Sequence, residues 1–454
     1  GLMIYKIWLR LRNAMHSLNS SFSVASSFIG LILVGTFLLM LPISSKSGQW
    51  TPLIDALFTA TSASCVTGLA VLDTGKYFSL FGKTVIILLI QIGGLGIMTI
   101  TTLFSVGIGR RLKMKQRFLM QDALNQDNSA EIEKITAKII KYTLFIEFVF
   151  GTILAWYLYD DYGMEAIYWG YWHAVSAFCN AGFDLLGDFT SFVNYRGDIV
   201  INVVLMTLII LGGIGFSVIG EVIHIRKWRD YSLHTKIVLT VNTALIVLGT
   251  LFIFFSEMDN PRTLAGLGLG EKLLASCFQS VSARTAGFNT IDIGAMQLPG
   301  LFIMACLMFV GASPNSTGGG IKTTTMAVIW LSTLSLLRDK KEVVIFKRRV
   351  DQNIISKSTS VFVLACLWLV LATFLLLCFD TGNHPLQLII FELFSAFGTV
   401  GLGVGITTEW NGLCKLVLIA TMFVGRIGIL TFSLSFFNKK IDSIRYPSEN
   451  IFIG

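Results

Sequence analysis

Eight long apolar runs constrain the fold of this chain more than any other feature of its sequence. They cover residues 22–41, 84–108, 137–159, 199–222, 237–255, 301–337 (with an interruption), 358–379 and 413–437. A helix needs about 20 apolar residues to cross a hydrocarbon layer about 30 Å thick. With 54% hydrophobic and only 14% charged residues, the chain has more apolar surface than one soluble core can enclose. We therefore predict an integral membrane protein with eight spanning helices.

The 35 Lys and Arg residues are distributed unevenly among the connections between these runs. Most lie at the N-terminus, in connections 110–141, 226–236 and 338–357, and in the C-terminal tail, whereas the alternate connections are richer in acidic residues. Basic connections stay on the cytoplasmic side of a membrane. Both termini are therefore predicted to be cytoplasmic, and the net charge of +8 is explained by anionic lipid rather than by nucleic acid.

The four acidic connections each contain a related motif centred on a glycine. Aligned on that glycine, the motifs read Ser64-Cys65-Val66-Thr67-Gly68-Leu69, Phe178-Cys179-Asn180-Ala181-Gly182-Phe183, Ala283-Arg284-Thr285-Ala286-Gly287-Phe288 and Phe397-Gly398-Thr399-Val400-Gly401-Leu402. The glycines are 114, 105 and 114 residues apart, which indicates an internal repeat. Each repeat would contain a spanning helix (M1), a half-helix (P), the glycine loop and a second spanning helix (M2).

A short amphipathic stretch precedes each glycine motif, at residues 51–62, 165–177, 270–282 and 385–396. A dozen helical residues extend only about 18 Å, so these stretches can enter a membrane but cannot cross it. Irregular backbone at that depth is tolerated only when it is buried in protein or lines water. We predict an all-α membrane protein in which four re-entrant pore helices and eight spanning helices surround a central pore with pseudo-fourfold symmetry.

Glycine suits a loop whose carbonyl oxygens must replace the hydration shell of a cation, because it adopts backbone angles that other residues disfavour. The carbonyl ends of the half-helices would also favour a cation. The predicted selectivity filter, with K⁺ bound only at its backbone carbonyls, consists of Val66, Thr67, Gly68, Asn180, Ala181, Gly182, Thr285, Ala286, Gly287, Thr399, Val400 and Gly401. The nearby Asp73, Asp184, Asp188 and Asp292 either concentrate cations or are ordinary solvated loop charges.

Four M1–P–M2 units with a glycine filter in each resemble the Trk/Ktr/HKT superfamily of potassium transporters over nearly the whole chain, and its Ktr-type membrane subunits in particular. Glycine at all four filter positions, including Gly68, implies preference for K⁺. The resemblance also implies a homodimer in the bacterial plasma membrane, in contact with lipid. A cytosolic regulatory ring would carry the nucleotide, with Na⁺ as a candidate activator and no cofactor in this chain.

The repeat pattern divides the chain into a cytoplasmic N-terminus, four units and a tail. The predicted boundaries are 1–17, 18–117, 118–236, 237–350, 351–437 and 438–454, with an intramembrane loop at 311–320 in the third unit. The second helices of the first two units contain Gly93-Gly94-Leu95-Gly96 and Gly212-Gly213-Ile214-Gly215, which we interpret as sites of close helix packing.

The third unit differs because a proline and four glycines interrupt its second helix, which we expect to be the only broken one. The interruption is Gly311, Ala312, Ser313, Pro314, Asn315, Ser316, Thr317, Gly318, Gly319 and Gly320. In the superfamily this segment is the intramembrane gating loop. Arg426, in the middle of the last span, is either one half of an ion pair or a positive barrier below the filter.

The remaining polar residues do not suggest catalysis. Glu147, His173 and Glu221 each lie alone on their element, and no Ser/His/Asp, Cys/His or paired-carboxylate cluster is evident. We expect a non-enzyme that conducts potassium under the control of a cytosolic partner. An ion-coupled secondary transporter of monovalent cations is the alternative.

Overall fold

The computed structural model describes residues 20–96, 99, 132–340 and 342–434, and it is predominantly helical. The helices are α2 (Ser20–Met40), α3 (Leu53–Ser64), α4 (Thr74–Tyr77), α5 (Leu80–Leu95), α8 (Ile132–Tyr162), α9 (Glu165–Phe178), α10 (Ile199–Gly213), α11 (Phe216–His224), α12 (Leu233–Glu257), α13 (Leu269–Ser282), α14 (Leu298–Phe309), α15 (Thr323–Leu337), α16 (Gln352–Phe379), α17 (Leu386–Phe397), α18 (Gly412–Ile427) and α19 (Ile429–Leu434). The predicted N-terminal segment 1–17, the tail 438–454 and the boundary at 117/118 lie outside the described residues.

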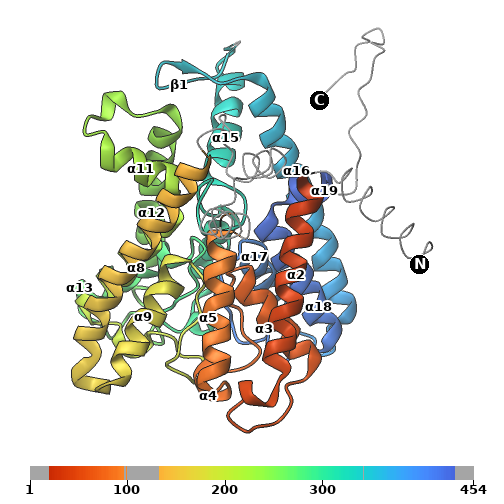
Figure 1. The fold of residues 1–454 in the computed structure, drawn as a ribbon. Coiled ribbons are helices and arrows are strands. Elements are labelled where there is room, and N and C mark those ends of the chain that lie inside the picture. The colour runs from red at the N-terminus through yellow and green to blue at the C-terminus, as the bar shows by residue number, and fades with distance from the viewer. Residues whose placement is uncertain (1–19, 97–98, 100–131, 341, 435–454) are drawn as a thin grey trace, which may run out of the picture.

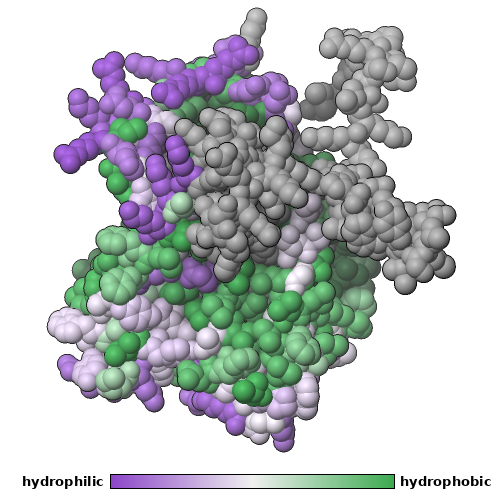
Figure 2. Space-filling model, viewed as in Figure 1, coloured by the Kyte–Doolittle hydropathy of each residue, from purple (hydrophilic) through white to green (hydrophobic). Residues whose placement is uncertain are grey.

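In the part of the chain that the structure describes, four helices, α2, α8, α12 and α16, are long and apolar enough to span a membrane. The bent pair α10 and α11 would make a fifth span, and α5, α14, α15 and α17 are shorter apolar helices. Figure 2 shows a broad hydrophobic band between two hydrophilic ends of the molecule. A belt of this kind is stable only against lipid, so the protein is membrane-embedded.

Four of the shorter helices lie where the sequence predicts half-helices. These are α3, α9, α13 and α17, each of 12 to 14 residues. Along the chain each follows a long helix and packs against it, α3 on α2, α9 on α8, α13 on α12 and α17 on α16 (Figure 1). Their C-terminal halves are buried, which places their carbonyl ends inside the protein.

The helices that follow the half-helices of the second and fourth units are also interrupted, so the expectation that only the third unit is broken was wrong, and the described helix of the first unit ends at a matching glycine. α5 ends at Gly96, α10 meets α11 at Gly215 with a bend of 102°, and α18 ends at Gly428. These three glycines have φ of +86°, +100° and +88°. The apolar run in the sequence continues past each of these glycines, so hydropathy does not reveal the break. A glycine with left-handed backbone angles can end a helix without any polar residue beside it.

The expected close packing by the glycines just before these breaks is present. A Cβ atom on Gly93, Gly212 or Gly425 would collide with the carbonyl oxygen of the last residue of α3, α9 or α17, respectively. The glycines therefore allow each second helix to lie directly against the end of the half-helix before it.

One feature departs from an all-α fold. β1 (Val344–Ile345) and β2 (Arg348–Arg349) form an antiparallel hairpin between α15 and α16. The buried side chains of Val343, Ile345 and Val350 pack with Ile237 of α12. The hairpin and α11 lie at one end of the molecule and α4 lies at the other (Figure 1).

Candidate functional site

The four glycine loops share one backbone conformation. In each loop the central glycine has a positive φ, and so does the residue two positions before it. The pairs are Val66 (+51°) with Gly68 (+91°), Asn180 (+56°) with Gly182 (+73°), Thr285 (+75°) with Gly287 (+82°), and Thr399 (+51°) with Gly401 (+95°). Left-handed angles at residues other than glycine carry strain, and four matched pairs indicate that the surrounding contacts impose the shape.

The loops meet in a closed ring. A Cβ atom on Gly68 would collide with the carbonyl oxygen of Ala181, one on Gly182 with that of Ala286, and one on Gly287 with that of Val400. The ring closes because a Cβ atom on Gly401 would collide with the carbonyl oxygen of Thr67. All twelve residues predicted from the sequence are thus in the four loops that make this ring, and glycine is required at each junction.

A serine near the end of each half-helix holds the loop that follows. The hydroxyls of Ser62 and Ser395 accept hydrogen bonds from the N–H of Gly68 and Gly401, each at 3.0 Å. Ser176 donates to the carbonyl of Phe183 at 2.7 Å, and Ser282 donates to that of Phe288. The serines fix the loops from behind, and the sequence reading did not identify them.

A second polar position lies one helical turn before the serine. His173 Nε2 accepts from the N–H of Leu185 at 3.1 Å, Gln279 Oε1 accepts from that of Thr290 at 3.0 Å, and Glu392 Oε1 accepts from that of Val404 at 2.9 Å. Each N–H belongs to the third residue after the ring glycine. His173 is therefore the hydrogen-bonded packing residue that its isolated position suggests. The sequence analysis did not identify Gln279 and Glu392. Each lies three residues before the serine, but only the folded loop shows that this position meets a backbone N–H.

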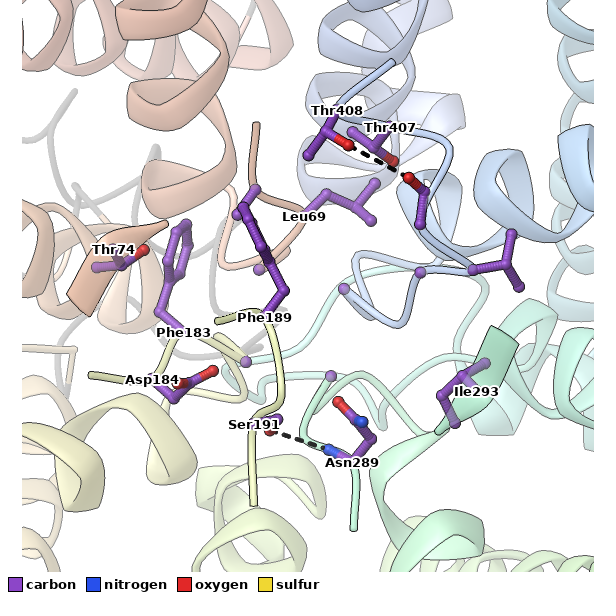
Figure 3. A pocket seen from close by; sticks show the side chains of 18 of the residues that line it. Leu69, Thr74, Phe183, Asp184, Phe189, Ser191, Asn289, Ile293, Thr407 and Thr408 are labelled. Carbon is purple, nitrogen blue, oxygen red and sulfur yellow. Dashed lines mark hydrogen bonds between the residues drawn. The ribbon is translucent and has the colours of Figure 1, made fainter. Parts of the chain in front are cut away.

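A cavity of about 280 Å³ opens on the side of the ring that carries α4, and all four ring glycines line it. Figure 3 shows Asp184, Asn289 and Thr407 among the side chains around it. Asp73, Asp184, Asp292 and Glu392 also line it. Asp188 does not belong to the lining and forms an exposed ion pair with Lys76. Of the four aspartates expected near the ring, three therefore line the cavity and the fourth is an exposed surface charge.

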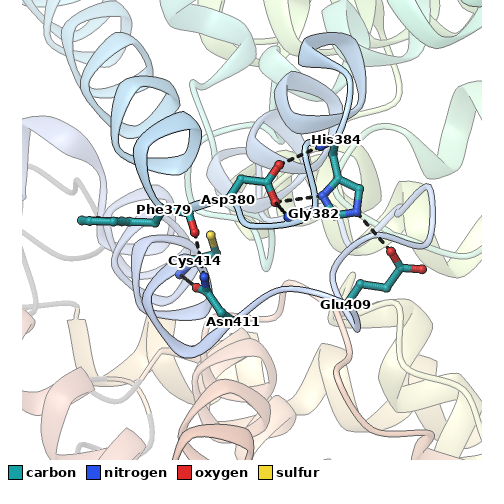
Figure 4. A network of polar contacts seen from close by, with 7 residues as sticks. All are labelled: Phe379, Asp380, Gly382, His384, Glu409, Asn411 and Cys414. Atoms are coloured by element: carbon teal, nitrogen blue, oxygen red, sulfur yellow. Dashed lines mark hydrogen bonds and ion pairs between the residues drawn. The ribbon is translucent and has the colours of Figure 1, made fainter.

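A second polar network supports the fourth loop from outside. His384 contacts Asp380, just after α16, at 2.9 Å through Nδ1, and Glu409 at 3.1 Å through Nε2 (Figure 4). Hydrogen bonds with Glu409 and Asp380 hold the pKa of His384 above its usual range. Since Glu409 follows the cavity-lining residues Thr407 and Thr408, the network ties the rim of the cavity to the end of a long helix.

If cations pass through this cavity, their flux is expected to rise as the pH on its side of the protein increases from 6 to 8. Burial, with a further contribution from Asp73, raises the pKa of Asp184 to about 7. The carboxyl is therefore neutral below that pH and negative above it, and the added charge should increase uptake from low K⁺ concentrations by roughly a few-fold. Asp184→Asn should flatten the pH profile of initial uptake rates, and Asp188→Asn is the matched control. A profile unchanged by Asp184→Asn would contradict the assignment.

The segment 311–320, predicted to be an intramembrane loop, contacts ring-loop residues that precede the glycines, whereas the loop residues that line the cavity are the glycines and residues after them. Its neck is closed by hydrogen bonds from Gly311 N to Ile321 O at 2.7 Å and from Ala312 N to Gly319 O at 3.2 Å. The N–H of Gly319 donates to Thr399 Oγ1 at 3.0 Å, and a Cβ atom on Gly318 would collide with Thr285 Oγ1. The segment therefore touches the side chains of two ring loops directly.

The tip of this segment is attached to other parts of the protein. Thr317 Oγ1 donates to Phe178 O or Gly212 O, at 3.0 and 3.1 Å, and its N–H also donates to Gly212 O. The carbonyl of Asn315 accepts from the N–H of Phe216 at 2.8 Å. The segment is thus held by hydrogen bonds to α9, α10 and α11 rather than by secondary structure of its own.

Arg426 is bound by carbonyl oxygens. Its guanidinium donates to Thr317 O of the intramembrane segment and to Gly93 O and Gly94 O at the end of α5. Its carbon Cζ also lies 5.9 Å from the centre of the Phe28 ring. Within the described part of the chain it has no carboxylate partner, so the ion-pair alternative finds no support there.

No group of three or more His, Cys, Asp or Glu side chains that could hold a metal occurs among the described residues. The fold and site define a membrane-embedded protein organised around a closed ring of glycine loops.

The chain belongs to the TrkH family of cation transport proteins, whose model matches residues 7–449. It is 44% identical to the Ktr system potassium uptake protein B of Bacillus subtilis, over 95% of this chain and 96% of that protein. It is 40% identical to the protein of the same name from Vibrio alginolyticus, covering 94% of this chain and 93% of the relative. The superfamily resemblance noted from the sequence is thereby confirmed.

Two further proteins extend the comparison. The Potassium/sodium uptake protein NtpJ of Enterococcus hirae is 36% identical over 95% of this chain and 96% of its own. The crystal structure of the potassium transporter TrkH from Vibrio parahaemolyticus aligns with a TM-score of 0.71, covering 93% of this chain and 86% of that one. At 18% identity this last match establishes the fold alone.

Proposed function

We propose that this protein is the K⁺-conducting subunit of a potassium uptake system, and that K⁺ passes through the ring formed by the four glycine loops. The observation that carries the proposal is the closure of the ring, in which each glycine meets the carbonyl before the next glycine. Relatives named as potassium uptake proteins support the choice of ion.

The physical basis is dehydration by backbone oxygens. A cation that enters a narrow ring must exchange its water shell for carbonyl oxygens, and here glycine backbone lets those oxygens approach. The half-helices α3, α9, α13 and α17 end at the loops with their negative dipole ends, which favours cations over anions. The carboxylates of the cavity would raise the local K⁺ concentration before entry.

We further propose that the chain consists of four M1–P–M2 repeats around this ring. Support comes from the matched order of long helix, half-helix, glycine loop and broken helix along the described chain. Matched serines behind the loops and matched glycines at the half-helix ends agree with it.

In this proposal the intramembrane segment is the gate. It contacts Thr285 and Thr399 of the ring on the side away from the cavity, where an ion leaving the ring would pass. Arg426 holds the tip of the segment closed and adds positive charge to the path.

The basic end of the molecule is proposed to face the cytoplasm and to dock a nucleotide-binding regulatory ring onto a homodimer of this chain. Trp228 and Phe346 stack edge to face there, with ring centres 6.2 Å apart, and both are substantially exposed. Exposed Lys347, Arg348 and Arg349 adjoin them. The basic connection 338–357 is described except for residue 341, whereas residues 110–131 of the first basic connection lie outside the described residues.

Reversing charge on the β-hairpin is expected to weaken binding of the regulatory partner in a salt-sensitive manner, because exposed charges act mainly by steering and complementarity. Lys347→Glu with Arg348→Glu should reduce the recovery of an affinity-tagged partner at low salt by roughly tenfold. Arg262→Glu, in the connection that follows α12, is the control. Normal recovery of the partner with the double variant would refute this docking surface.

Flux measurements test the proposed function. The purified protein in liposomes should pass K⁺ with a linear current–voltage relation at rates far above ~10³ ions per second, which exceeds ordinary turnover. It should also restore growth at low K⁺ to cells that lack potassium uptake. Slow flux that requires a co-transported ion would instead favour the alternative, an ion-coupled secondary transporter of monovalent cations.

A further inference from the structure

Arg284 is a buried cation that the proposed conduction path does not use. It lies three residues before Gly287, directly after α13 and its C-cap Ala283, and its side chain is almost completely enclosed. The guanidinium points away from its own loop. Nη1 donates to Asn242 Oδ1 on α12, and Nη2 donates to Gly311 O at 3.1 Å.

The acceptor on Gly311 belongs to the neck of the intramembrane segment. There Gly311 and Ile321 are hydrogen-bonded, and Val310 pairs with Ile321 as an isolated parallel bridge. Arg284 therefore joins the base of the third glycine loop to the point where the segment leaves α14.

Asn242 extends the connection into the segment. Its Nδ2 donates to Ser313 Oγ at 3.0 Å, and Ser313 Oγ shares a hydrogen bond of 2.9 Å with Thr323 Oγ1 at the start of α15. A single network thus holds the glycine loop, α12 and both sides of the neck.

The other three loops show that a large side chain is not needed for packing at this register. The matching residues are Cys65, Cys179 and Gly398, all small. Within the described part of the chain, the arginine occurs in the one loop whose following helix is interrupted by a long segment. Burying a guanidinium is unfavourable unless its donors are used. Among the described residues, Arg284 Nε has no hydrogen-bond acceptor and the guanidinium has no carboxylate partner. Neither packing nor ion pairing therefore explains why an arginine occupies this position.

We propose that Arg284 is a positioning residue that clamps the neck of the intramembrane segment to the third glycine loop, so that K⁺ selectivity at Gly287 stays the same whether or not the segment is in place. The inference rests on the proposed conduction function and deepens it. With the segment in place, it is also held by hydrogen bonds from Ser313 N to Gly213 O and from Thr317 N to Gly212 O. Once the tip moves, Arg284 still joins the neck to the third loop, while Gly319 N on Thr399 Oγ1 joins it to the fourth loop.

The test compares K⁺/Na⁺ permeability ratios in liposomes for four forms of the full chain: unaltered, Arg284→Gln, a deletion of residues 313–318, and both changes together. The deletion removes the tip and Ser313 but keeps Asn242 and Gly311, the two acceptors of Arg284. The deletion alone should leave the ratio unchanged and Arg284→Gln alone should lower it about twofold. The two together should lower it about tenfold or more.

A purely structural arginine would give a different pattern. Arg284→Gln would then lower the ratio equally in both backgrounds, and that result overturns the proposal, as does an unchanged ratio in the double variant. Cys65→Ala, at the same register in the first loop, should leave the ratio unchanged in both backgrounds. If the unaltered chain passes no K⁺, the proposed function fails first, which separates the two claims.

Substitutes keep the proposal testable if a variant does not fold. Asn242→Ala removes one acceptor of Arg284 and can replace Arg284→Gln. Thr317→Val removes the side-chain hydrogen bonds of the tip and can replace the deletion. As before, the first substitution should lower the K⁺/Na⁺ permeability ratio much more when the second change is also present. If the ratio falls equally with and without the second change, the proposal is overturned.

Discussion

Replacing Gly287 by Ser is expected to remove most of the discrimination between K⁺ and Na⁺, lowering the permeability ratio by about tenfold or more. A side chain at φ +82° is strained by roughly 1–3 kcal/mol. The new Cβ would also collide with the carbonyl oxygen of Val400 in the neighbouring loop. A free-energy change of about 1.4 kcal/mol corresponds to a factor of ten. Strain of this size in one of the four loops is therefore sufficient to lower the permeability ratio about tenfold.

Gly163→Ser is the matched control for Gly287→Ser. Gly163 also has a positive φ, +58°, but open space surrounds the position of its Cβ, so the control carries backbone strain without a collision. Both variants should fold, since the ring is one small part of the buried interior. Equal permeability ratios for Gly287→Ser and Gly163→Ser, measured in liposomes, would count against a selective ring.

Deleting residues 313–318 is expected to raise K⁺ flux in the absence of the regulatory partner by about tenfold or more. The deletion is structurally feasible because Ala312 N and Gly319 O, on either side of it, are already hydrogen-bonded at 3.2 Å. It removes Thr317 and with it the contacts to Phe178, Gly212 and Arg426. A segment that has no helix of its own is expected to open before the helices that surround it.

Single substitutions in and around the segment should raise K⁺ flux by less than the deletion does. Arg426→Gln should raise flux partially, since it frees the tip at Thr317 O and removes a positive charge from the path. Ser316→Ala should have little effect, because that hydroxyl donates only to Ser313 O within the segment. Potassium uptake in a transport-deficient cell, with and without the partner, measures all three. A deletion variant that stays closed until the partner is added would show that the segment is not the gate.

The half-helices and glycine loops were predictable because their signals are local. The predicted range 385–396 differs from α17, Leu386–Phe397, by one residue at each end. An apolar stretch too short to span, followed by glycine at a constant period, needs no tertiary information. The predicted filter residues all occur in one structural ring for the same reason.

The breaks in the second helices were not predictable in this way. Leu95 and Ile214 are apolar and flank glycines, and the same pattern fits both a packed continuous helix and a helix that ends. Only the positive φ at Gly96 and Gly215 distinguishes them, and that angle depends on what each helix meets. The third unit was recognised because its interruption contains a proline.

The residues that hold the ring from behind depend on contacts between distant parts of the chain. Glu392 is an isolated acid in an apolar helix until Val404 and Thr407 return to it at 2.9 and 2.7 Å. Arg284 likewise has meaning only beside Asn242 and Gly311, 42 and 27 residues away. No local period in the sequence encodes either relation.

The central claim is that K⁺ is bound by backbone carbonyls at the ring of glycine loops. Anomalous diffraction from crystals of the protein soaked in Tl⁺, a K⁺ substitute, tests it most directly. The account predicts peaks on the axis between the loops that contain Gly68, Gly182, Gly287 and Gly401, and weaker or displaced peaks in Gly287→Ser. Ordered Tl⁺ elsewhere in the membrane region, with none at the ring in protein that still transports K⁺, would contradict it.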